Sequence, residues 1–220
     1  MCNARAPLVS LQDFFAQAPL YAILDTSLCQ QRSCRDVLEA LLRAGVKVIQ
    51  YRHKEKFRRV HFEECVALAR RTQELGGVFF VNDRADVAEL CGADGVHLGQ
   101  DDLPVEPTRR FLRRSVRIGY STHNLEQARR AEAFPVDYLA IGPVFATSSK
   151  KDPDAVVGLE TVSQVRASTA KPLVAIGGIT LENAPAVRKA GAHAVAVIRD
   201  LLTASDVEAR ARQFLAVLKA

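Results

Sequence analysis

The sequence predicts a single closed (β/α)8 TIM barrel that spans residues 1–220. Short apolar runs alternate with amphipathic segments along the chain, and the pair repeats about every 25 to 30 residues, the length of one strand plus one helix. Polar residues follow almost every apolar run. A chain with 48% apolar and 25% charged residues can also bury one sizeable core.

Eight apolar runs are expected to form the strands. Each is almost continuously apolar, which is typical of parallel strands that are covered on both faces. The runs are LYAIL (20–24), VKVIQ (46–50), VFFV (78–81), GVHL (95–98), VRIGY (116–120), DYLAIG (137–142), PLVAIG (172–177) and HAVAVI (193–198).

Amphipathic segments between these runs are expected to be helices. Several end on glycine directly before the next run, as at Gly45 and Gly191, and glycine suits the left-handed position just past a helix end. The segments include 34–45, 61–77, 124–134, 159–168, 181–191 and 206–218.

The polar segments favour a closed barrel over an open doubly wound sheet. They follow nearly all of the strands, and the carboxyl ends of barrel strands converge on one mouth. An open sheet collects its chemistry at one switch point, and a dinucleotide-binding sheet carries G-x-G-x-x-G after its first strand, whereas LYAILDTSLC contains no glycine.

Composition argues against several function classes. The net charge of +5 comes from arginine pairs on separate predicted helices, so we expect no nucleic-acid partner. No apolar run approaches the roughly 18 residues of a membrane span, and no secretory signal is evident, so we expect a cytoplasmic protein without a membrane partner. The cysteines are odd in number, lack C-x2-C spacing and are expected to be free thiols: Cys2, Cys29, Cys34, Cys65 and Cys91.

Two neighbouring strands end in acid, at Asp83 and at Asp101-Asp102. Adjacent strands lie about 4.8 Å apart, so the carboxylates of Asp83 and Asp102 are expected to reach one point. Two such charges need a cation between them, and Mg2+ takes one or two protein carboxylates beside phosphate oxygens. The alternative is that each aspartate caps the helix after it.

Basic and amide groups at the same mouth predict phosphate binding. Gln50, Arg52 and Lys54 alternate along one extended segment and therefore face the same way. Lys150 lies in a long loop that can sweep over the site, although a solvated surface loop is the simpler reading.

A second anion pocket is expected at Gly177-Gly178 and at the segment from Ile198, because the loops after strands seven and eight of barrels often hold a phosphate. Tight packing of the turn also explains the two glycines. The first pocket, beside the metal, suits a diphosphate, and the second suits a monophosphate.

Three polar residues at or near the mouth have simpler roles. His97 lies inside a strand and is interpreted as a hydrogen-bonded core residue. Ser121 and His123 can each donate to a substrate, but no third residue or nucleophile elbow supports a Ser/His nucleophile pair.

From Leu20 to about Leu201 the chain resembles the thiamine phosphate synthase family. The motifs that carry this resemblance are Gln50-x-Arg52-x-Lys54, Asn82-Asp83, ADGVHLGQDDLP (93–104), GYSTH (119–123), GPVFATSSKK (142–151) and AIGGIT (175–180). The resemblance implies a Mg2+-dependent transferase that joins an aminopyrimidine methyl diphosphate to a thiazole phosphate, forming thiamine phosphate and pyrophosphate.

The resemblance also implies roles for individual residues. The implied magnesium ligands are Asp83 and Asp102. The residues implied to bind the thiazole phosphate are Thr147 and Ser149, together with a cradle of Gly178 and Ile198-Arg199. The residues implied to bind the pyrimidine diphosphate are Gln50, Arg52, Lys54, Asn82, Ser121 and Lys150.

The implied mechanism is a dissociative displacement. Arg52, Lys54 and Lys150, with Mg2+, stabilise the departing pyrophosphate, and the thiazole nitrogen captures the cationic methylene. Ser121 completes the expected catalytic set.

Three features depart from the family pattern. Arg199 stands where the family usually has serine, either to grip the phosphate or to pair with Asp200. Tyr51 and His53 replace the commoner leucine and acid, and Ser149 replaces threonine.

Two other functions remain as alternatives. One is the related thiazole tautomerase, an isomerase that would use His123 for proton transfer. The other is a non-catalytic phosphate-binding module. The metal carboxylates and Lys150 favour the synthase, and the sequence does not indicate an oligomeric state.

Overall fold

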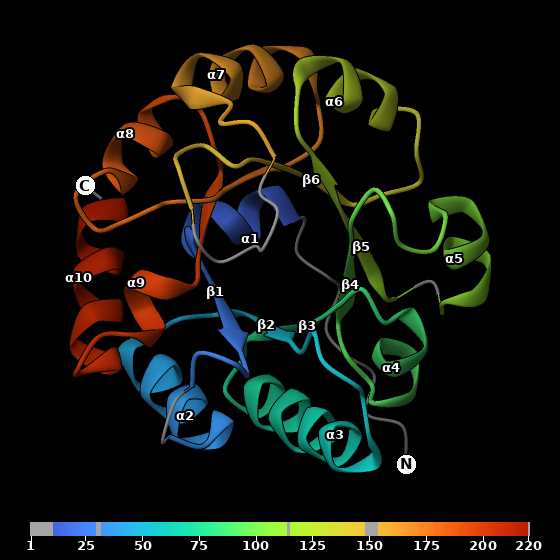
Figure 1. The fold of residues 1–220 in the computed structure, drawn as a ribbon, viewed down its shortest axis with the longest axis vertical. Coiled ribbons are helices and arrows are strands. Elements are labelled where there is room, and N and C mark those ends of the chain that lie inside the picture. Colours follow the sequence, from blue (N-terminus) through green and yellow to red (C-terminus); the bar gives the residue numbers. More distant parts are fainter. Residues whose placement is uncertain (1–10, 30–31, 114, 148–153, 220) are drawn as a thin grey trace.

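Eight parallel strands form a closed barrel in the order in which they occur along the chain. The computed structural model describes residues 11–29, 32–113, 115–147 and 154–219. Each strand pairs with the next, and β8 pairs with β1, with Leu20 opposite Val195. Figure 1 shows the helices as a ring around the strands. The predicted (β/α)8 barrel is confirmed.

The strands agree with the predicted runs to within two residues at either end. Their bounds are β1 Leu20–Asp25, β2 Val48–Arg52, β3 Val78–Asn82, β4 Gly95–Leu98, β5 Arg117–Thr122, β6 Tyr138–Ile141, β7 Leu173–Ile176 and β8 Ala194–Val197.

The helices include every segment expected from the sequence, together with short ones that it did not indicate. Three of these helices, α1, α5 and α9, have fewer than two turns, which is too short for a periodic apolar pattern to be recognised in the sequence. The bounds are α1 Leu11–Gln17, α2 Cys34–Ala44, α3 Arg59–Glu74, α4 Ala85–Leu90, α5 Val105–Phe111, α6 Leu125–Ala131, α7 Gly158–Ser168, α8 Ala184–Lys189, α9 Arg199–Leu202 and α10 Val207–Lys219.

Helix α2 shows how local sequence sets these bounds. The side chain of Ser33 accepts a hydrogen bond from the backbone N–H of Asp36 and caps the first turn. At the other end Gly45 has a φ of 96° and donates to the carbonyls of Leu41 and Leu42. Glycine adopts this left-handed backbone without steric cost, which ends the helix and turns the chain toward β2.

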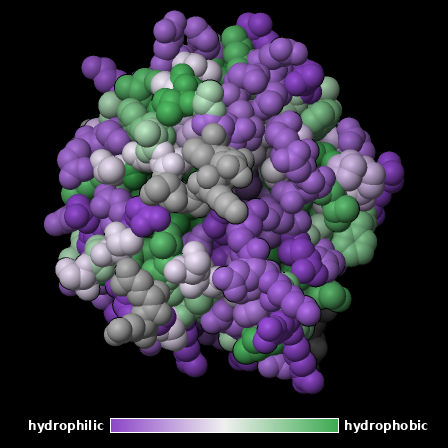
Figure 2. Space-filling model, in the orientation of Figure 1, coloured by the Kyte–Doolittle hydropathy of each residue, from purple (hydrophilic) through white to green (hydrophobic). Residues whose placement is uncertain are grey.

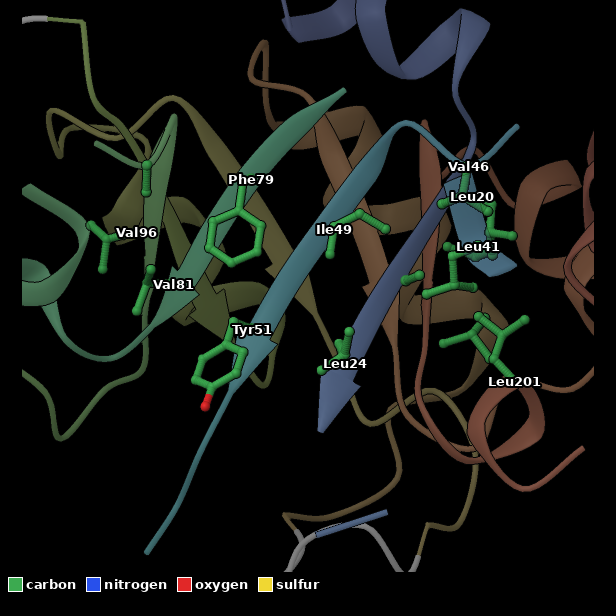
Figure 3. Close-up of a cluster of buried hydrophobic side chains, with 14 of the residues drawn as sticks. Leu20, Leu24, Leu41, Val46, Ile49, Tyr51, Phe79, Val81, Val96 and Leu201 are labelled. Carbon is green, nitrogen blue, oxygen red and sulfur yellow. The ribbon is translucent and has the colours of Figure 1, made fainter. Parts of the chain in front are cut away.

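Strand residues alternate between the barrel interior and the surrounding helices. On β2 the side chain of Ile49 packs in the layer between strands and helices, whereas Val48 packs inside the barrel. Figure 3 shows Ile49, Tyr51 and Phe79 in the outer layer. Alternate residues of each strand therefore point inward and outward, and only the inward-pointing residues can line a site inside the barrel.

Helix α1 covers the N-terminal end of the barrel. Its Phe15 side chain is fully buried and packs edge-on against Tyr138, with ring centroids 5.6 Å apart. Phe15 also lies 6.4 Å from the ring of Tyr21. In Figure 1 this helix lies within the ring formed by the other helices. The interior is thus closed from below by an aromatic cluster.

In the part of the chain that the structure describes, every helix is too short or too polar to cross a membrane.

We predict that Phe15→Ala lowers the free energy of unfolding by about 3–5 kcal/mol, because it removes a fully buried ring and leaves a cavity under the barrel. Chemical denaturation followed by circular dichroism measures this loss. Phe111→Ala is the matched control, since that side chain is 57% exposed and should change stability little. Equal effects of the two substitutions would contradict the role given to α1.

Candidate active site

A cavity of about 770 Å³ lies inside the barrel and opens at the carboxyl ends of the strands. All eight strands contribute side chains to its wall. In the view of Figure 2, hydrophilic residues gather near the centre, over the barrel. The cavity is therefore both large enough for two small phosphorylated molecules and accessible to them.

The two sides of the cavity differ in chemistry. Strands β2 to β5 and the segments that follow them supply amide, basic and acidic groups. Strands β6 to β8 supply small apolar groups, among them Ala140, Val174 and Ala196. The apolar side offers a surface against which a flat ring can pack, and the polar side offers groups that can bind charged ligand atoms.

The predicted alternation of Gln50, Arg52 and Lys54 brings all three to the cavity. Arg52 forms an ion pair with Asp25, a carboxylate at the end of β1 with only 4% of its side chain exposed. Asp25 also accepts hydrogen bonds from the backbone and hydroxyl of Ser27, at 2.9 and 2.6 Å. This ion pair holds the guanidinium at the mouth, where its other N–H groups can face an anion.

Asp83 and Asp102 lie side by side, as predicted from the neighbouring strand ends. Burial raises the pKa of Asp102, and the charge of Asp83 and a hydrogen bond between the two carboxyls raise it further. The Lys54 ammonium lies 2.6 Å from the Asp83 carboxylate and offsets part of this repulsion. The two carboxylates form a site of concentrated negative charge.

Neither aspartate caps a helix, so the alternative reading of this pair is wrong. The cap residues of α4 and α5 are Arg84 and Pro104, and neither makes a side-chain capping bond. Asp83 instead has a φ of 62°, a backbone conformation that side-chain-bearing residues rarely adopt. Asp102 accepts a hydrogen bond of 2.6 Å from the backbone of Gly99 within its own turn.

The donor set at this point suits a small hard cation. Two carboxylates are what Mg2+ usually takes from a protein, and their mutual repulsion is relieved when a divalent ion binds between them. Among the described residues there is no cluster of three or more His, Cys, Asp or Glu that could form a complete cage. An ion held here would fill its other positions with water and ligand oxygens.

Two further predicted residues lie on the same side of the cavity. The side-chain nitrogen of Asn82 is buried and has no hydrogen-bond partner in the described part of the chain. Such a donor is costly to leave unpaired, so it is available for a ligand. Ser121 lies across from it on β5, and its hydroxyl is 2.9 Å from Nε2 of His97.

His97 is hydrogen-bonded inside the barrel, as predicted, but it also lines the cavity. Its Nδ1 lies 2.8 Å from the hydroxyl of Tyr138, so both ring nitrogens have partners. Burial lowers the pKa of His97 to about 4, partly offset by the charge of Asp102. The ring is neutral at physiological pH and acts as a fixed hydrogen-bonding group.

The second predicted pocket forms where the β6–α7 and β7–α8 loops meet. Gly178 and Ile198 line the cavity, together with Thr147. A Cβ on Gly178 would lie 2.4 Å from the carbonyl oxygen of Ala146, so close packing alone requires glycine there. The packing reading of this residue is therefore correct, and phosphate binding stays a prediction.

Arg199 is exposed at the first position of α9 and does not line the cavity. Its suggested partner Asp200 accepts a hydrogen bond of 2.7 Å from the backbone of Leu181 and lies 3.7 Å from Arg210. Ser149 and Lys150 lie outside the described residues.

Ser121 and His123 do not form a nucleophile pair. His123 donates from Nδ1 to the carbonyl of Gly142 at 2.6 Å, whereas the Ser121 hydroxyl faces His97. His123 also lies 3.5 Å from Asp154, on the far side of the β6–α7 loop. These contacts connect His123 to both ends of that loop, at Gly142 and at Asp154.

The unusual residues of the Gln-x-Arg-x-Lys segment point away from the cavity. The Tyr51 hydroxyl donates to Glu64 on α3 at 2.7 Å, within the outer layer shown in Figure 3. His53 is 2.8 Å from the hydroxyl of Thr26, and its ring centroid lies 3.8 Å from that of His61. Both departures therefore leave the inward-facing groups in place.

Sequence reasoning missed three residues that complete the site, namely Asp25, Tyr21 and Tyr138. Asp25 was visible as an acid directly after the first apolar run, the same signal that identified Asp83. The tyrosines lie within apolar runs and gave no polar signal.

The family model of thiamine monophosphate synthase matches residues 20–201 of the chain. The chain is 43% identical to the thiamine-phosphate synthase of Pelotomaculum thermopropionicum over 92% of its own length and 93% of that protein. It is 45% identical to the Koribacter versatilis thiamine-phosphate synthase over 90% and 95% of the two chains. A solved structure of thiamine phosphate pyrophosphorylase from Pyrococcus furiosus superposes with a TM-score of 0.84 at 36% identity, covering 93% and 97%.

We predict that the His97 ring remains neutral at about pH 5.5, because burial lowers its pKa to about 4 from an ordinary value near 6.5. The unfolded chain binds a proton between these two values and the folded chain does not, so this residue makes the protein less stable as the pH falls from about 6.5 toward 4. Ring nitrogen chemical shifts followed by NMR give the midpoint, with His97→Gln to assign the signal. A midpoint near 6.5 would show that the ring is solvated.

Proposed function

The chain belongs to the thiamine monophosphate synthase family, and from that premise we propose how its residues carry out the reaction. The enzyme is a transferase that forms thiamine phosphate and releases pyrophosphate. Its substrates are a phosphorylated aminopyrimidine and a phosphorylated thiazole. The observation that carries the proposal is the meeting of two carboxylates and two basic groups at one barrel mouth: Asp83, Asp102, Arg52 and Lys54.

The diphosphate of the pyrimidine substrate is assigned to the polar side. Arg52 offers a guanidinium fixed by Asp25, and Lys54 offers a mobile ammonium with 52% of its side chain exposed. A diphosphate that displaces Asp83 from Lys54 gains the ammonium and frees the carboxylate for a metal. Lys150 is proposed, from the sequence resemblance, to add a further cation from the β6–α7 loop.

Mg2+ is the proposed cofactor, held by Asp83 and Asp102. Their oxygen donors and the charge repulsion between them fit a divalent ion of this kind. When bound, the ion supplies positive charge beside the oxygens of the leaving group. Asp101, which is exposed next to Asp102, has no part in this proposal.

The pyrimidine ring is assigned to Gln50, Asn82 and Ser121, whose side chains reach the cavity below the diphosphate side. The thiazole phosphate is assigned to Thr147, Gly178 and Ile198, which line the cavity. Ser149 and Arg199 are proposed to join them from the sequence resemblance alone, since the Arg199 side chain does not line the cavity. The apolar wall of β6 to β8 also lines the cavity and suits two stacked or adjacent rings.

The reaction exchanges one bond for another at the pyrimidine methylene. The carbon–oxygen bond to the diphosphate breaks, and pyrophosphate leaves with the electron pair. The positive charge left on the methylene is spread over the aminopyrimidine ring until the thiazole nitrogen donates its lone pair and forms the carbon–nitrogen bond. The chain's contribution is positioning and charge: Arg52, Lys54 and Lys150 stabilise the departing pyrophosphate, and Ser121 holds the ring.

The expectations of one domain over residues 1–220, a cytoplasmic location and the absence of a nucleic-acid partner stay predictions.

Purified protein mixed with both substrates and Mg2+ should produce thiamine phosphate and pyrophosphate in equal amounts. Omission of Mg2+, with a chelator present, should suppress both products. Chromatography detects the first product, and an enzyme-coupled assay detects the second. Absence of product with both substrates present would refute the synthase, and isomerisation of the thiazole compound alone would indicate the tautomerase.

We predict that Asp102→Ala lowers kcat by roughly 10²-fold or more, because one of the two carboxylates that hold the metal is lost. Circular dichroism should show an intact fold. Asp101→Ala is the matched control and should retain most of the activity. If Asp102→Ala is as active as Asp101→Ala, the metal assignment is wrong.

A further inference from the structure

Two buried cysteines meet in the layer between the strands and the helices. Cys29 follows β1, and Cys34 is the first residue of α2. Their sulfur atoms lie 3.7 Å apart, and both are free thiols, as predicted for the described cysteines. Cys2 lies outside the described residues. A disulfide holds its sulfurs about 2.0 Å apart, so a modest movement of one side chain brings this pair to bonding distance.

The hydrogen bonds of the pair make Cys29 the sulfur that ionises first. The Cys29 thiol donates to the carbonyl of Asp25 at 3.4 Å, so within the pair Cys34 is the donor and Cys29 the acceptor. The hydrogen bond between the sulfurs lowers the pKa of Cys29 against the effect of burial, and it raises the pKa of Cys34. Burial raises the pKa of Cys65, and it raises that of Cys91 to about 11. Because the thiolate is the reactive form, Cys29 is the cysteine most open to oxidation.

Glu64 on α3 completes the cluster. A hydrogen bond to its carboxylate raises the pKa of Cys34 further, so the Cys34 hydrogen has a second acceptor beside Cys29. Glu64 is half-buried, and Cys29 and Cys34 are 3% and 7% exposed, whereas Cys65 is fully buried. The pair therefore lies close enough to the surface for an oxidant of about the size of water.

We propose that Cys29 and Cys34 form a reversible disulfide that controls how Arg52 is held. The oxidant is a peroxide: the Cys29 thiolate attacks one oxygen, the oxygen–oxygen bond breaks, and hydroxide leaves and takes up the released proton as water. Cys34 then attacks the sulfur of the resulting sulfenic acid, and a second water leaves as the sulfur–sulfur bond forms. The two thiols lose two electrons and two protons, and hydrogen peroxide becomes two waters. A dithiol reductant restores both thiols.

Cys29 is the residue that moves when the disulfide forms. Cys34 lies in the first turn of α2, which the Ser33 side chain caps. Directly before that cap, the Arg32 side chain donates to the carbonyl of Ala204 at 3.1 Å. Both contacts hold the Cys34 end of the pair, so closing the gap between the sulfurs draws Cys29 toward α2.

Movement of Cys29 reaches Arg52 through Asp25. Once its thiol hydrogen is lost, Cys29 no longer donates to the Asp25 carbonyl. The backbone of Leu28 donates to the same carbonyl at 3.0 Å, and Ser27 donates to the Asp25 carboxylate. That carboxylate is the ion-pair partner of Arg52. The disulfide therefore loosens the guanidinium assigned to the pyrophosphate, a consequence that rests on the proposed function.

Peptide mapping tests the disulfide itself. Trypsin cuts after Arg32, between the two cysteines, so the disulfide joins two peptides, residues 6–32 and 33–35, that reduction separates. After the wild type is treated with hydrogen peroxide and its remaining thiols are alkylated, mass spectrometry should detect the joined peptides. If both peptides are recovered only in alkylated form, the inference is overturned.

Enzyme kinetics tests the consequence for the site. Peroxide should lower wild-type kcat/KM for the pyrimidine diphosphate by about tenfold, and a dithiol should restore it, because Arg52 is held less firmly in the oxidised protein. Cys29→Ser keeps a hydroxyl that can donate to the Asp25 carbonyl, so it should match the reduced wild type and resist peroxide. The matched control, Cys91→Ser, should be inactivated as the wild type is. Equal inactivation of the two variants would contradict the proposed pair.

Cys34→Ser decides the matter if Cys29→Ser does not fold. Without Cys34 the oxidation of Cys29 should stop at the sulfenic acid, which dimedone traps at that residue. In the wild type the disulfide should form instead, and dimedone should trap little. Equal trapping at Cys29 in the two proteins, or none in Cys34→Ser, would count against the inference.

Calorimetric binding of inorganic pyrophosphate in the presence of Mg2+ separates this inference from the proposed function. If the reduced wild type forms no thiamine phosphate, the proposed function fails. Weaker pyrophosphate binding after oxidation, restored by a dithiol, would still support the inference. If the wild type forms product at the same rate before and after the joined peptides appear, the function stands and the inference fails.

Discussion

The pairing of β8 with β1 is the constraint on which the rest of the structure depends. Once Leu20 lies opposite Val195, the sheet has no free edge and an inside is distinguished from an outside on every strand. Because side chains alternate along a strand, successive residues then point to opposite sides of the barrel wall. Gln50 faces the cavity and Tyr51 faces α3 because they are adjacent on one strand. Closure also brings the acids that end β3 and the turn after β4 to the same mouth as Arg52.

Most of the fold could be predicted from local pattern. Apolar runs identified the eight strands, and the glycine that follows α2 at Gly45 marks the place where the chain turns into β2. The site was predictable wherever polar residues interrupt a run at the strand end, as at Asp83 and Asp102. Their shared position required only that sequential strands be neighbours.

Contacts between distant parts of the chain were beyond a single sequence. Tyr21 and Tyr138 are 117 residues apart and lie within apolar runs, so nothing in their surroundings shows that their hydroxyl groups meet. His97 could be identified as a core histidine, but its partners could not. The helix-cap reading of the two aspartates was wrong for a local reason: the caps of α4 and α5 are Arg84 and Pro104, so neither acid stands at a cap position.

In the part of the chain that the structure describes, the aromatic cluster around Phe15 closes the barrel at the end opposite the mouth. Whatever occupies the deepest level, beside Tyr21 and Tyr138, must arrive before anything that fills the level above it. The same order holds in reverse for departure, since a molecule at the bottom waits for the one near the rim. The order in which molecules enter and leave the cavity is thus set by its shape as well as by binding affinity.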